Sequence, residues 1–351
     1  MTFEEFIMQA REMNASDIHL TVGAPTVVRV NGELRKYTEL SDQVVNRTIL
    51  SILSAEQEKM LNDGKDIDFS FELKNGARQR VNVFRQSGKL AACIRLLNAE
   101  IPTLEELKMP PVLLDFAKKR RGLVLVTGPT GAGKSTTLAA LVEYINKTRP
   151  CHIITIEDPI EYRYKQEKAT IHQRELGRDV PSFHEALRSA LREDPDVILI
   201  GEMRDYETIS LAMTAAETGH LVFGTLHTSS AAQTVDRIID ACPVHSQEQV
   251  RSQLASMIQA IIAQSLIPRS DGKGRVAAVE VMVGTDAIKN LIRSNKINMM
   301  ETTMASGGRD GMCTLNDSLA KLYRTGQISY ETALEYSTDR NEMEKKLLNS
   351  I

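Results

Sequence analysis

The sequence contains few cysteines, and none of them is close to another. They are Cys93, Cys151, Cys242 and Cys313 in a chain of 351 residues. Metal knuckles use closely spaced pairs such as Cys-x-x-Cys, so no bound zinc is expected. Scattered single cysteines are typical of a reducing cytosol, where most of them serve as small core residues.

Long apolar runs and a strong excess of either charge are absent too. No stretch approaches the roughly 20 apolar residues that cross a bilayer. The first residues, MTFEEFIMQA, carry acids where a secretory signal would carry bases. The net charge is −3 and neither half is strongly basic, so no nucleic-acid partner is expected. We therefore expect a cytoplasmic protein that does not insert into a membrane.

The length and the hydrophobic pattern predict more than one domain, because 351 residues exceed one ordinary core. Residues 1–99 combine a helical pattern over 3–13 with several strand-like runs, which predicts a small mixed domain with an antiparallel sheet. The strand-like runs are 17–20, 26–30, 66–73, 78–86 and 89–97.

Three prolines mark residues 100–112 as an extended linker. Beyond it, short apolar runs alternate with helical stretches, which indicates a buried parallel sheet and an α/β core over residues 113–271. The apolar runs are 123–127, 153–156, 197–200 and 221–225. The pattern of residues 272–351 is mainly helical.

Residues 128–136 carry the strongest chemical signal. GPTGAGKST matches G-x-x-x-x-G-K-[ST] at every fixed position, between the apolar run LVLVT and a helical run. Glycines let such a loop wrap a phosphate with its N–H groups inward, and the following helix N-terminus adds positive partial charge. Lys134 is expected to reach the β- and γ-phosphates of ATP, and Ser135 to hold Mg²⁺. The residues assigned to nucleotide binding are Gly128, Pro129, Thr130, Gly131, Ala132, Gly133, Lys134, Ser135 and Thr136.

Acidic residues follow two of the other predicted strands. Glu202 comes after the run VILI, where a P-loop protein needs an acid that holds the Mg²⁺ shell through water, and it stands in place of the more usual Asp. The other strand ends at Glu157 and Asp158, with Glu161 close behind. Three acids at one strand end are costly without a cation nearby, which Mg²⁺ supplies. One of them is expected to act as general base, and spacing alone leaves the choice among the three open.

Two histidines flank the apolar run 221–225. His227 lies just past its end, which suits sensing of a γ-phosphate or of a neighbouring subunit. His220 precedes the run, and a structural role is as well supported there as a functional one. A zinc pair is not favoured, because their spacing across a strand gives no shared ligand face.

Arginines recur along the strand-like runs of the N-terminal domain, at Arg78, Arg80, Arg85 and Arg95. Alternation along strands places several of them on one sheet face, where they are candidates for arginine fingers. A solvated surface is the alternative interpretation.

Together these segments resemble the secretion-ATPase superfamily of hexameric motors and, within it, the PilT family of type IV pilus retraction ATPases. The resemblance covers nearly the whole chain. ASDIHL and RVNGEL resemble the opening of that family, and GPTGAGKSTTLAA its Walker A segment. TIEDPIEY resembles its Asp box, DPDVILIGEMRD its Walker B segment and TGHLVFGTLHTSSA its His box.

The resemblance implies an α/β fold with a RecA-like P-loop NTPase core, an N-terminal PAS-like α+β domain and a helical C-terminal region. It places the catalytic glutamate on Glu161, the Mg²⁺-associated acid on Glu202 and the γ-phosphate contacts on Arg80 and Arg95, with Arg85 as a further candidate. It also implies a homohexameric ATPase at the cytoplasmic face of the inner membrane. Its partners would be the pilus platform protein and an accessory retraction ATPase.

Residues 287–296 bear on which motor of the superfamily this is. AIKNLIRSNK resembles the retraction signature AIRNLIRE and departs from it at Lys289 and Ser294. An ordinary amphipathic helix is the alternative interpretation.

Other functions are less favoured by the sequence. Assembly and type II secretion ATPases carry an additional N-terminal domain and a paired-cysteine zinc module, whereas here the PAS-like domain is expected to begin near Met1. The accessory PilU-like ATPases are closer rivals. A GTP switch would need Asp where Arg149 ends the segment NKTR, and a DNA translocase is disfavoured by the acidic balance.

Overall fold

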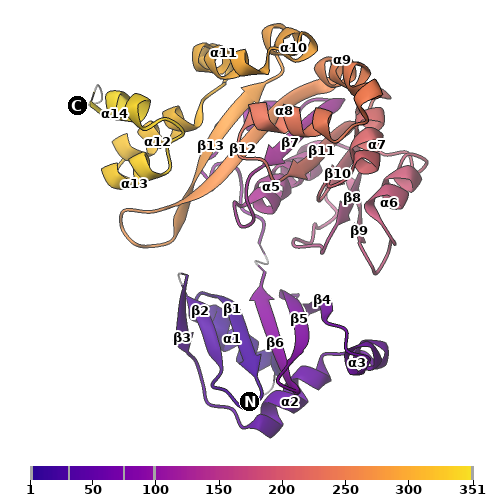
Figure 1. Cartoon of the computed structure of the whole chain (residues 1–351). Helices are drawn as coiled ribbons and strands as arrows, with labels where there is room; N and C mark the ends of the chain where they lie inside the picture. Colours follow the sequence, from indigo (N-terminus) through magenta and orange to yellow (C-terminus); the bar gives the residue numbers. More distant parts are fainter. Residues whose placement is uncertain (1–2, 31, 74–75, 98–99, 349–351) are drawn as a thin grey trace. The chain divides into compact units, whose positions relative to one another are not determined.

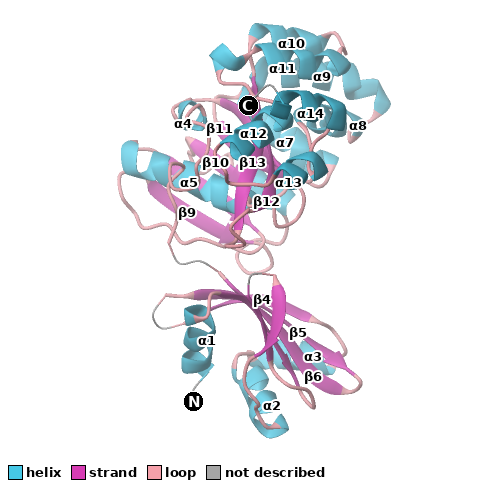
Figure 2. Cartoon of the chain, turned by 90° about the vertical axis from the view of Figure 1, so that its left-hand side faces the viewer, coloured by secondary structure: helices cyan, strands magenta, loops and turns pink. Residues whose placement is uncertain are grey.

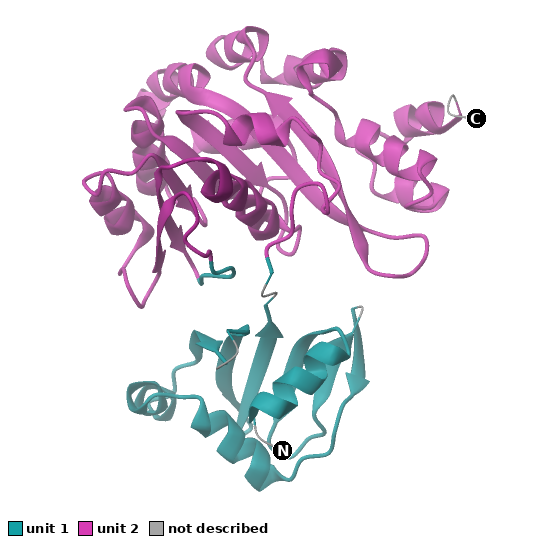
Figure 3. Cartoon of the chain, turned by 180° about the vertical axis from the view of Figure 1, so that it is seen from behind, with its two compact units in different colours: residues 1–100, 159–163 teal, residues 101–158, 164–351 magenta. Residues whose placement is uncertain are grey.

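The computed structural model describes residues 3–30, 32–73, 76–97 and 100–348. The chain forms two compact units, one with residues 1–100 and 159–163 and the other with residues 101–158 and 164–351 (Figure 3). We call the first the N-terminal unit and the second the C-terminal unit.

The N-terminal unit is a six-stranded antiparallel sheet in the order β3-β2-β1-β6-β5-β4, with helices on one face (Figure 2). Val81 of β5 faces these helices and shares a core with Ile7 of α1 and Ile49 of α2. Arg80 projects from the opposite face, because side chains alternate along a strand, and it pairs in register with Arg95 of β6. The elements are α1 (Phe3–Glu12), β1 (Ala15–Thr21), β2 (Val27–Val30), β3 (Glu33–Lys36), α2 (Asp42–Ser51), α3 (Ala55–Asn62), β4 (Ile67–Glu72), β5 (Arg78–Gln86) and β6 (Lys89–Leu96).

The predicted helix and all five predicted strands of this unit are confirmed, with shifts of at most a few residues at their ends. The sequence interpretation missed β3, whose four residues are all exposed and show no alternation of burial. It also missed α2 and α3. Both begin at a serine whose hydroxyl accepts a backbone hydrogen bond, Ser41 for α2 and Ser54 for α3, so the missed signal is the helix cap.

The C-terminal unit is built on a seven-stranded sheet in the order β13-β12-β7-β11-β10-β8-β9, in which only β12 and β13 are antiparallel neighbours (Figure 1). The sheet and its covering helices comprise α4 (Leu113–Ala117), β7 (Gly122–Thr127), α5 (Lys134–Thr148), β8 (His152–Glu157), β9 (Thr170–Glu175), α6 (Phe183–Ala190), β10 (Val197–Ile200), α7 (Tyr206–Glu217), β11 (Leu221–Leu226), α8 (Ala231–Asp240), α9 (Gln247–Met257), β12 (Ile258–Pro268) and β13 (Arg275–Val283). The helices that follow are α10 (Asp286–Arg293), α11 (Met300–Ser306), α12 (Leu315–Arg324), α13 (Tyr330–Glu335) and α14 (Arg340–Leu348).

Both faces of the central strands are buried. Leu123 and Leu125 of β7 belong to the core shared with α6, α7, α8 and α9, whereas Val124 and Val126 belong to the core shared with α4 and α5. This explains why these strands read as continuous apolar runs. Among the helices of the described residues, none has both the length and the apolar character that crossing a bilayer requires.

Residues 101–112 form a compact turn on the C-terminal unit. Thr103 opens the turn, since its N–H donates to the carboxylate of Glu106 at 2.7 Å and its hydroxyl accepts from the N–H of Glu106 at 3.2 Å. Leu104 and Met109 are buried in the core that contains α4 and α5. The extended conformation expected here was therefore wrong, because the apolar residues between the prolines have a core in which to be buried.

Residues 275–283 form a strand, β13, although the sequence pattern placed them in a mainly helical region. The strand pairs with β12 from Ala260 opposite Val283 to Pro268 opposite Arg275. Most of its residues are buried regardless of which face they occupy, so the two-residue period that marks a strand is hidden.

The segment that resembles the retraction signature forms α10. Ile288 and Ile292 are fully buried, while Arg293 and Ser294 are exposed. The Ser294 hydroxyl donates to the carbonyl of Asn290 at 2.7 Å at the end of the helix. The signature therefore presents one face to the core and another to solvent, as its amphipathic pattern predicted.

A buried carboxylate joins the sheet to two helices. Glu280 of β13 is 6% exposed, and its Oε1 accepts from the N–H of Ala231, the first residue of α8, at 2.6 Å. Burial raises the pKa of Glu280 above its usual value, although hydrogen bonds from the N–H groups of Ala231 and of Leu315, the first residue of α12, lower it.

We expect Glu280→Gln to be at least as stable as the parent protein near neutral pH. The raised pKa means that the folded state holds this proton more tightly, so the parent protein loses stability as the pH rises above the unfolded pKa. Gln keeps one acceptor and carries no charge. Thermal unfolding between pH 4 and pH 8 should show the advantage of the variant shrinking toward pH 4, and a growing advantage at low pH would contradict this account.

Candidate nucleotide-binding site

The loop between β7 and α5 has the conformation of an anion receptor. Gly128 (φ 144°) and Gly133 (φ 88°) adopt positive φ values that other residues reach only with strain. Gly133 directly precedes α5, whose first-turn N–H groups lack intrahelical partners and point toward the loop. A Cβ on Gly128 would lie 2.2 Å from the carbonyl oxygen of Gln264, so the glycine also permits a close approach of β12.

Lys134 lies across this loop. Its Nζ donates to the carbonyl oxygens of Gly128 at 2.7 Å and Pro129 at 3.1 Å, which holds the ammonium group above the loop. Ser135 is exposed on the first turn of α5. The positive charge, the N–H groups and the helix terminus therefore converge on one place, which favours a phosphate group.

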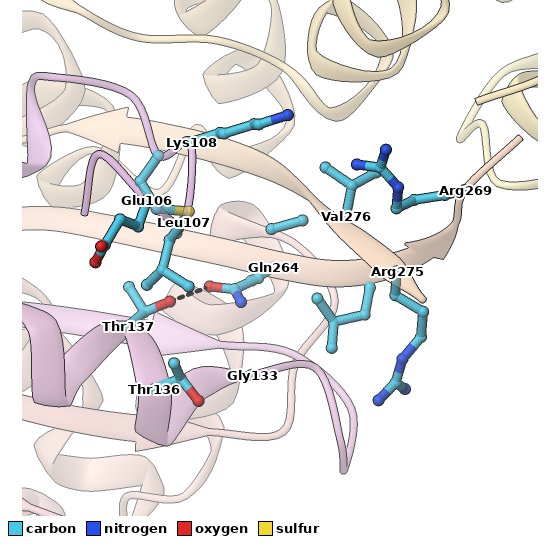
Figure 4. Close-up of a pocket in the computed structure, with 13 residues that line it drawn as sticks. Glu106, Leu107, Lys108, Gly133, Thr136, Thr137, Gln264, Arg269, Arg275 and Val276 are labelled. Atoms are coloured by element: carbon cyan, nitrogen blue, oxygen red, sulfur yellow. Dashed lines mark hydrogen bonds between the residues drawn. The ribbon is translucent and has the colours of Figure 1, made fainter. Parts of the chain in front are cut away.

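Gln264 of β12 clamps the loop from behind, and the sequence analysis missed it. This side chain is 4% exposed. Its Oε1 accepts from the hydroxyl of Thr137 at 2.8 Å (Figure 4). Its Nε2 donates to the carbonyl of Ala132 at 2.6 Å. In the sequence, Gln264 is recognisable only as a polar residue inside the apolar run that forms β12, and it belongs to no known motif.

A cavity of about 240 Å³ opens beside the loop (Figure 4). Its apolar walls come from Leu107, Leu266 and Val276, and Arg269 and Arg275 lie at its polar side. The loop contributes Gly133, Thr136 and Thr137 to the same cavity. A flat apolar ring next to a phosphate group would fit here, as expected for the nucleoside part of a nucleotide.

Glu202 and His227 meet at the ends of neighbouring strands. Gly201 and Glu202 follow β10, and His227 follows β11, which pairs with β10 in parallel. His227 Nε2 lies 3.0 Å from Glu202 Oε1. The loop around Lys134 begins at the next strand end, because Gly128 N–H donates to the carbonyl of Leu226 at 3.3 Å. The predicted grouping of Glu202 and His227 at the P-loop edge of the sheet thus follows from the strand order.

Arg204 is a second residue that the sequence analysis missed. Its Nε lies 2.6 Å from Glu202 Oε1, and its Nη2 donates to Glu202 Oε2 at 2.6 Å. This hydrogen bonding is the main cause that lowers the pKa of Glu202 below its usual value, and the charges of Arg204 and His227 act in the same direction against burial. Glu202 is therefore an ionised carboxylate.

The three acids at the end of β8 and just beyond it differ in their surroundings. Glu157 Oε1 accepts from the hydroxyl of Thr155 at 2.6 Å and from Nε2 of Gln173 at 3.3 Å, so it is held by the sheet. Asp158 is exposed. Glu161 is half-buried in the irregular segment 159–163, which belongs to the N-terminal unit.

Two of the four candidate arginines of the N-terminal unit, Arg80 and Arg95, are already paired with acids. Arg80 binds Asp68 through Nε at 3.1 Å and Nη2 at 2.7 Å, and Arg95 Nε lies 3.0 Å from Asp17 Oδ1. The expectation that several arginines share one sheet face holds for Arg80 and Arg95.

The other two candidate arginines, Arg78 and Arg85, have uncharged partners. Arg85 Nη2 donates to Asn62 Oδ1 of α3 at 2.8 Å, on the helix side of the sheet. Arg78 is 4% exposed and donates to Ser70 Oγ at 2.7 Å. Both contacts tie the unit together internally.

His220 lies at the opposite end of β11 from His227. Its Nδ1 is 2.9 Å from the carbonyl of Ala215 and 3.2 Å from the hydroxyl of Thr218. These contacts join β11 to the end of α7, which favours a structural role for His220.

Magnesium fits this site as an ion that arrives with a nucleotide. Among the described residues, no group of three or more His, Cys, Asp and Glu side chains could hold a metal ion. Mg²⁺ commonly needs only one or two protein ligands when phosphates and waters supply the rest. The Ser135 hydroxyl and the ionised Glu202 suit that requirement.

Comparison with known proteins identifies the family. The profile of the family described as "Type II/IV secretion system protein" matches residues 1–345. The type IV pilus retraction ATPase PilT of Pseudomonas aeruginosa is 49% identical over 337 residues, covering 95% of this chain and 98% of the relative. The type IV pilus ATPase PilU of the same organism is 39% identical over 345 residues, covering 98% and 90%.

Solved structures agree with the sequence comparison. The crystal structure of the pilus retraction motor PilT with bound ADP superposes with a TM-score of 0.90 at 47% identity, covering 98% of this chain and 99% of that one. The ATPase DotB of Legionella pneumophila gives a TM-score of 0.83 at 30% identity, covering 95% of each chain. These matches confirm the expected fold, a RecA-like core preceded by a smaller α+β domain. The chain belongs to the Type II/IV secretion system protein family.

Proposed function

We propose that this protein is a Mg²⁺-dependent ATPase motor that powers the retraction of type IV pili. The observation that carries the proposal is the complete phosphate loop, with Lys134 lying across it, in a chain that resembles a retraction ATPase over nearly its full length. The relative solved with ADP supports a nucleotide as the ligand of this loop.

The residues of the loop would bind the nucleotide in two parts. The N–H groups of residues 130–136 and the Lys134 ammonium receive the phosphates, and the cavity lined by Leu107, Leu266 and Val276 receives the nucleoside. Magnesium, when bound, neutralises charge that develops on the phosphates. Ser135 would hold it directly, and Glu202 through water.

We assign the general base to Glu161 among the acids Glu157, Asp158 and Glu161. Glu157 is held by Thr155 and Gln173, which favours a structural role for it. The γ-phosphate contacts are assigned to Arg80 and Arg95, which lie side by side on one sheet face, and the sensing role to His227. Both arginines would have to exchange their present aspartate partners for the phosphate.

The proposed assembly is a homohexamer at the cytoplasmic face of the inner membrane. Its partners would be the platform protein of the pilus and an accessory retraction ATPase. DotB, a related solved protein, is likewise an ATPase by its description, which supports ATP hydrolysis as the activity of this chain.

An accessory retraction ATPase is the second candidate, supported by the match to PilU. The higher identity to PilT, 49% against 39%, favours the main retraction motor. Type II secretion ATPases are more distant, since the Pseudomonas aeruginosa type II secretion system protein E is 36% identical over 66% of this chain.

Glu161→Gln should bind ATP normally and hydrolyse it about 10² to 10⁴ times more slowly, because general-base catalysis contributes a factor of that size. Affinity for a fluorescent ATP analogue and steady-state phosphate release would be measured together. Glu157→Gln is the matched control, because it alters a neighbouring acid that the sheet holds, and its turnover should stay near that of the parent protein. The reverse pattern would move the base to Glu157.

Gln264→Ala should weaken ATP binding about tenfold, because it leaves the Thr137 hydroxyl and the Ala132 carbonyl without their partner, at a cost of about 1–3 kcal/mol. Calorimetric titration with a non-hydrolysable ATP analogue would measure the dissociation constant. Gln259→Ala, on the same strand, is the control and should bind as the parent does. Equal losses in both variants would indicate a general effect on β12.

Retraction itself can be tested in the source cell. Deletion of the gene should leave cells that carry pili and do not twitch, and the parent gene, but not Lys134→Ala, should restore movement. Loss of surface pili after deletion would indicate an assembly motor instead.

A further inference from the structure

The guanidinium of Arg204 binds the carboxylate of Glu202, which in the proposed function holds the water shell of magnesium. The two groups form a forked pair, with Arg204 Nε 2.6 Å from Glu202 Oε1 and Arg204 Nη2 2.6 Å from Glu202 Oε2. Such bidentate, charge-assisted hydrogen bonds are the strong class of ion pair. His227 adds a third contact at 3.0 Å, so both carboxylate oxygens are engaged.

The two partners of this pair differ in their freedom to move. The Glu202 side chain is 19% exposed, and the adjacent Met203 N–H donates to the carbonyl of Thr225 at 3.0 Å, which anchors its backbone to β11. The Arg204 side chain is 67% exposed. The next residue, Asp205, caps α7 by accepting from the N–H of Thr208 at 2.8 Å, so the backbone around Arg204 is fixed while its long side chain reaches into solvent.

A divalent cation and a guanidinium cannot share this carboxylate without cost. Like charges a few ångströms apart repel, and the repulsion is stronger at a partly buried group than in bulk water. Asp158 offers Arg204 another acid, since its charge already acts on Arg204 and helps to raise the pKa of the guanidinium. This second negative charge would lower the cost of separating Arg204 from Glu202.

We propose that Arg204 is a positioning residue that competes with the metal–nucleotide complex for Glu202, holding the carboxylate in its absence and releasing it when the complex binds. The inference rests on the proposed function, because it needs a metal ion beside the phosphate loop. It makes Arg204 a determinant of how much magnesium the protein needs.

The alternative is an ordinary surface ion pair, which contributes little and can be removed without effect on ligands. The two interpretations differ in metal affinity, which can be read without turnover. Mn²⁺ serves as the probe, because electron paramagnetic resonance reports its free concentration. Full-length protein saturated with ADP would be titrated with Mn²⁺.

We expect Arg204→Ala to bind Mn²⁺ about three- to tenfold more tightly than the parent protein, since the competing cation is gone. Arg204→Lys keeps the charge and loses the fork, so its affinity should fall between the two. Arg340→Ala is the matched control, because it removes another exposed arginine paired with a glutamate, Glu344, on α14. It should bind Mn²⁺ as the parent does.

A double variant shows whether the gain in Mn²⁺ affinity depends on Glu202. Arg204→Ala should produce no tightening in a Glu202→Gln background, because the disputed carboxylate is absent. The proposal is overturned if Arg204→Ala and Arg204→Lys both bind Mn²⁺ no more tightly than the parent, or if the gain persists without Glu202. Failure of the proposed function looks different, since the parent protein would then not bind ADP at all.

Discussion

Parallel hydrogen bonding between β7, β11, β10 and β8 is the constraint on which the whole nucleotide site depends. Parallel strands end at the same edge of a sheet, so the segments that follow them are brought together whatever their distance along the chain. The phosphate loop follows β7, His227 follows β11 and Glu202 follows β10, while Glu157 ends β8 and Asp158 follows it. Burial of both sheet faces keeps this register from slipping.

The charged groups assigned to the nucleotide already have partners within their own units. Glu202 of the C-terminal unit is matched by Arg204 and His227, and in the N-terminal unit Arg80 is matched by Asp68 and Arg95 by Asp17. Under the proposed function, a nucleotide with its metal would exchange these partners rather than fill empty positions. Exchange of this kind keeps the cost of isolated buried charge low in every state, and it lets binding energy rearrange side chains, which a motor requires.

The fold was predictable where local sequence and burial agree. The phosphate loop needs particular residues within nine consecutive positions, so it can be recognised from the sequence alone. The sequence did not predict β13, because burial on both faces hides the two-residue period of a strand. It did not predict the turn at Leu104 either, because the prolines suggested an extended chain although a core was available for the apolar residues between them. The serines that cap α2 and α3 could have been recognised in the sequence as helix starts, but the sequence interpretation did not use them.

The sequence by itself determined the candidate residue types and their order, because Lys134 ends the loop after one recognisable strand, and Glu202 and His227 stand within two residues of the ends of two others. Only the tertiary structure decided which side chains support them. Gln264 and Thr137 are 127 residues apart along the chain and meet because β12 lies beside β7. Arg204 could equally have faced solvent, and its hold on Glu202 follows from the way α7 and β11 fix the backbone around it.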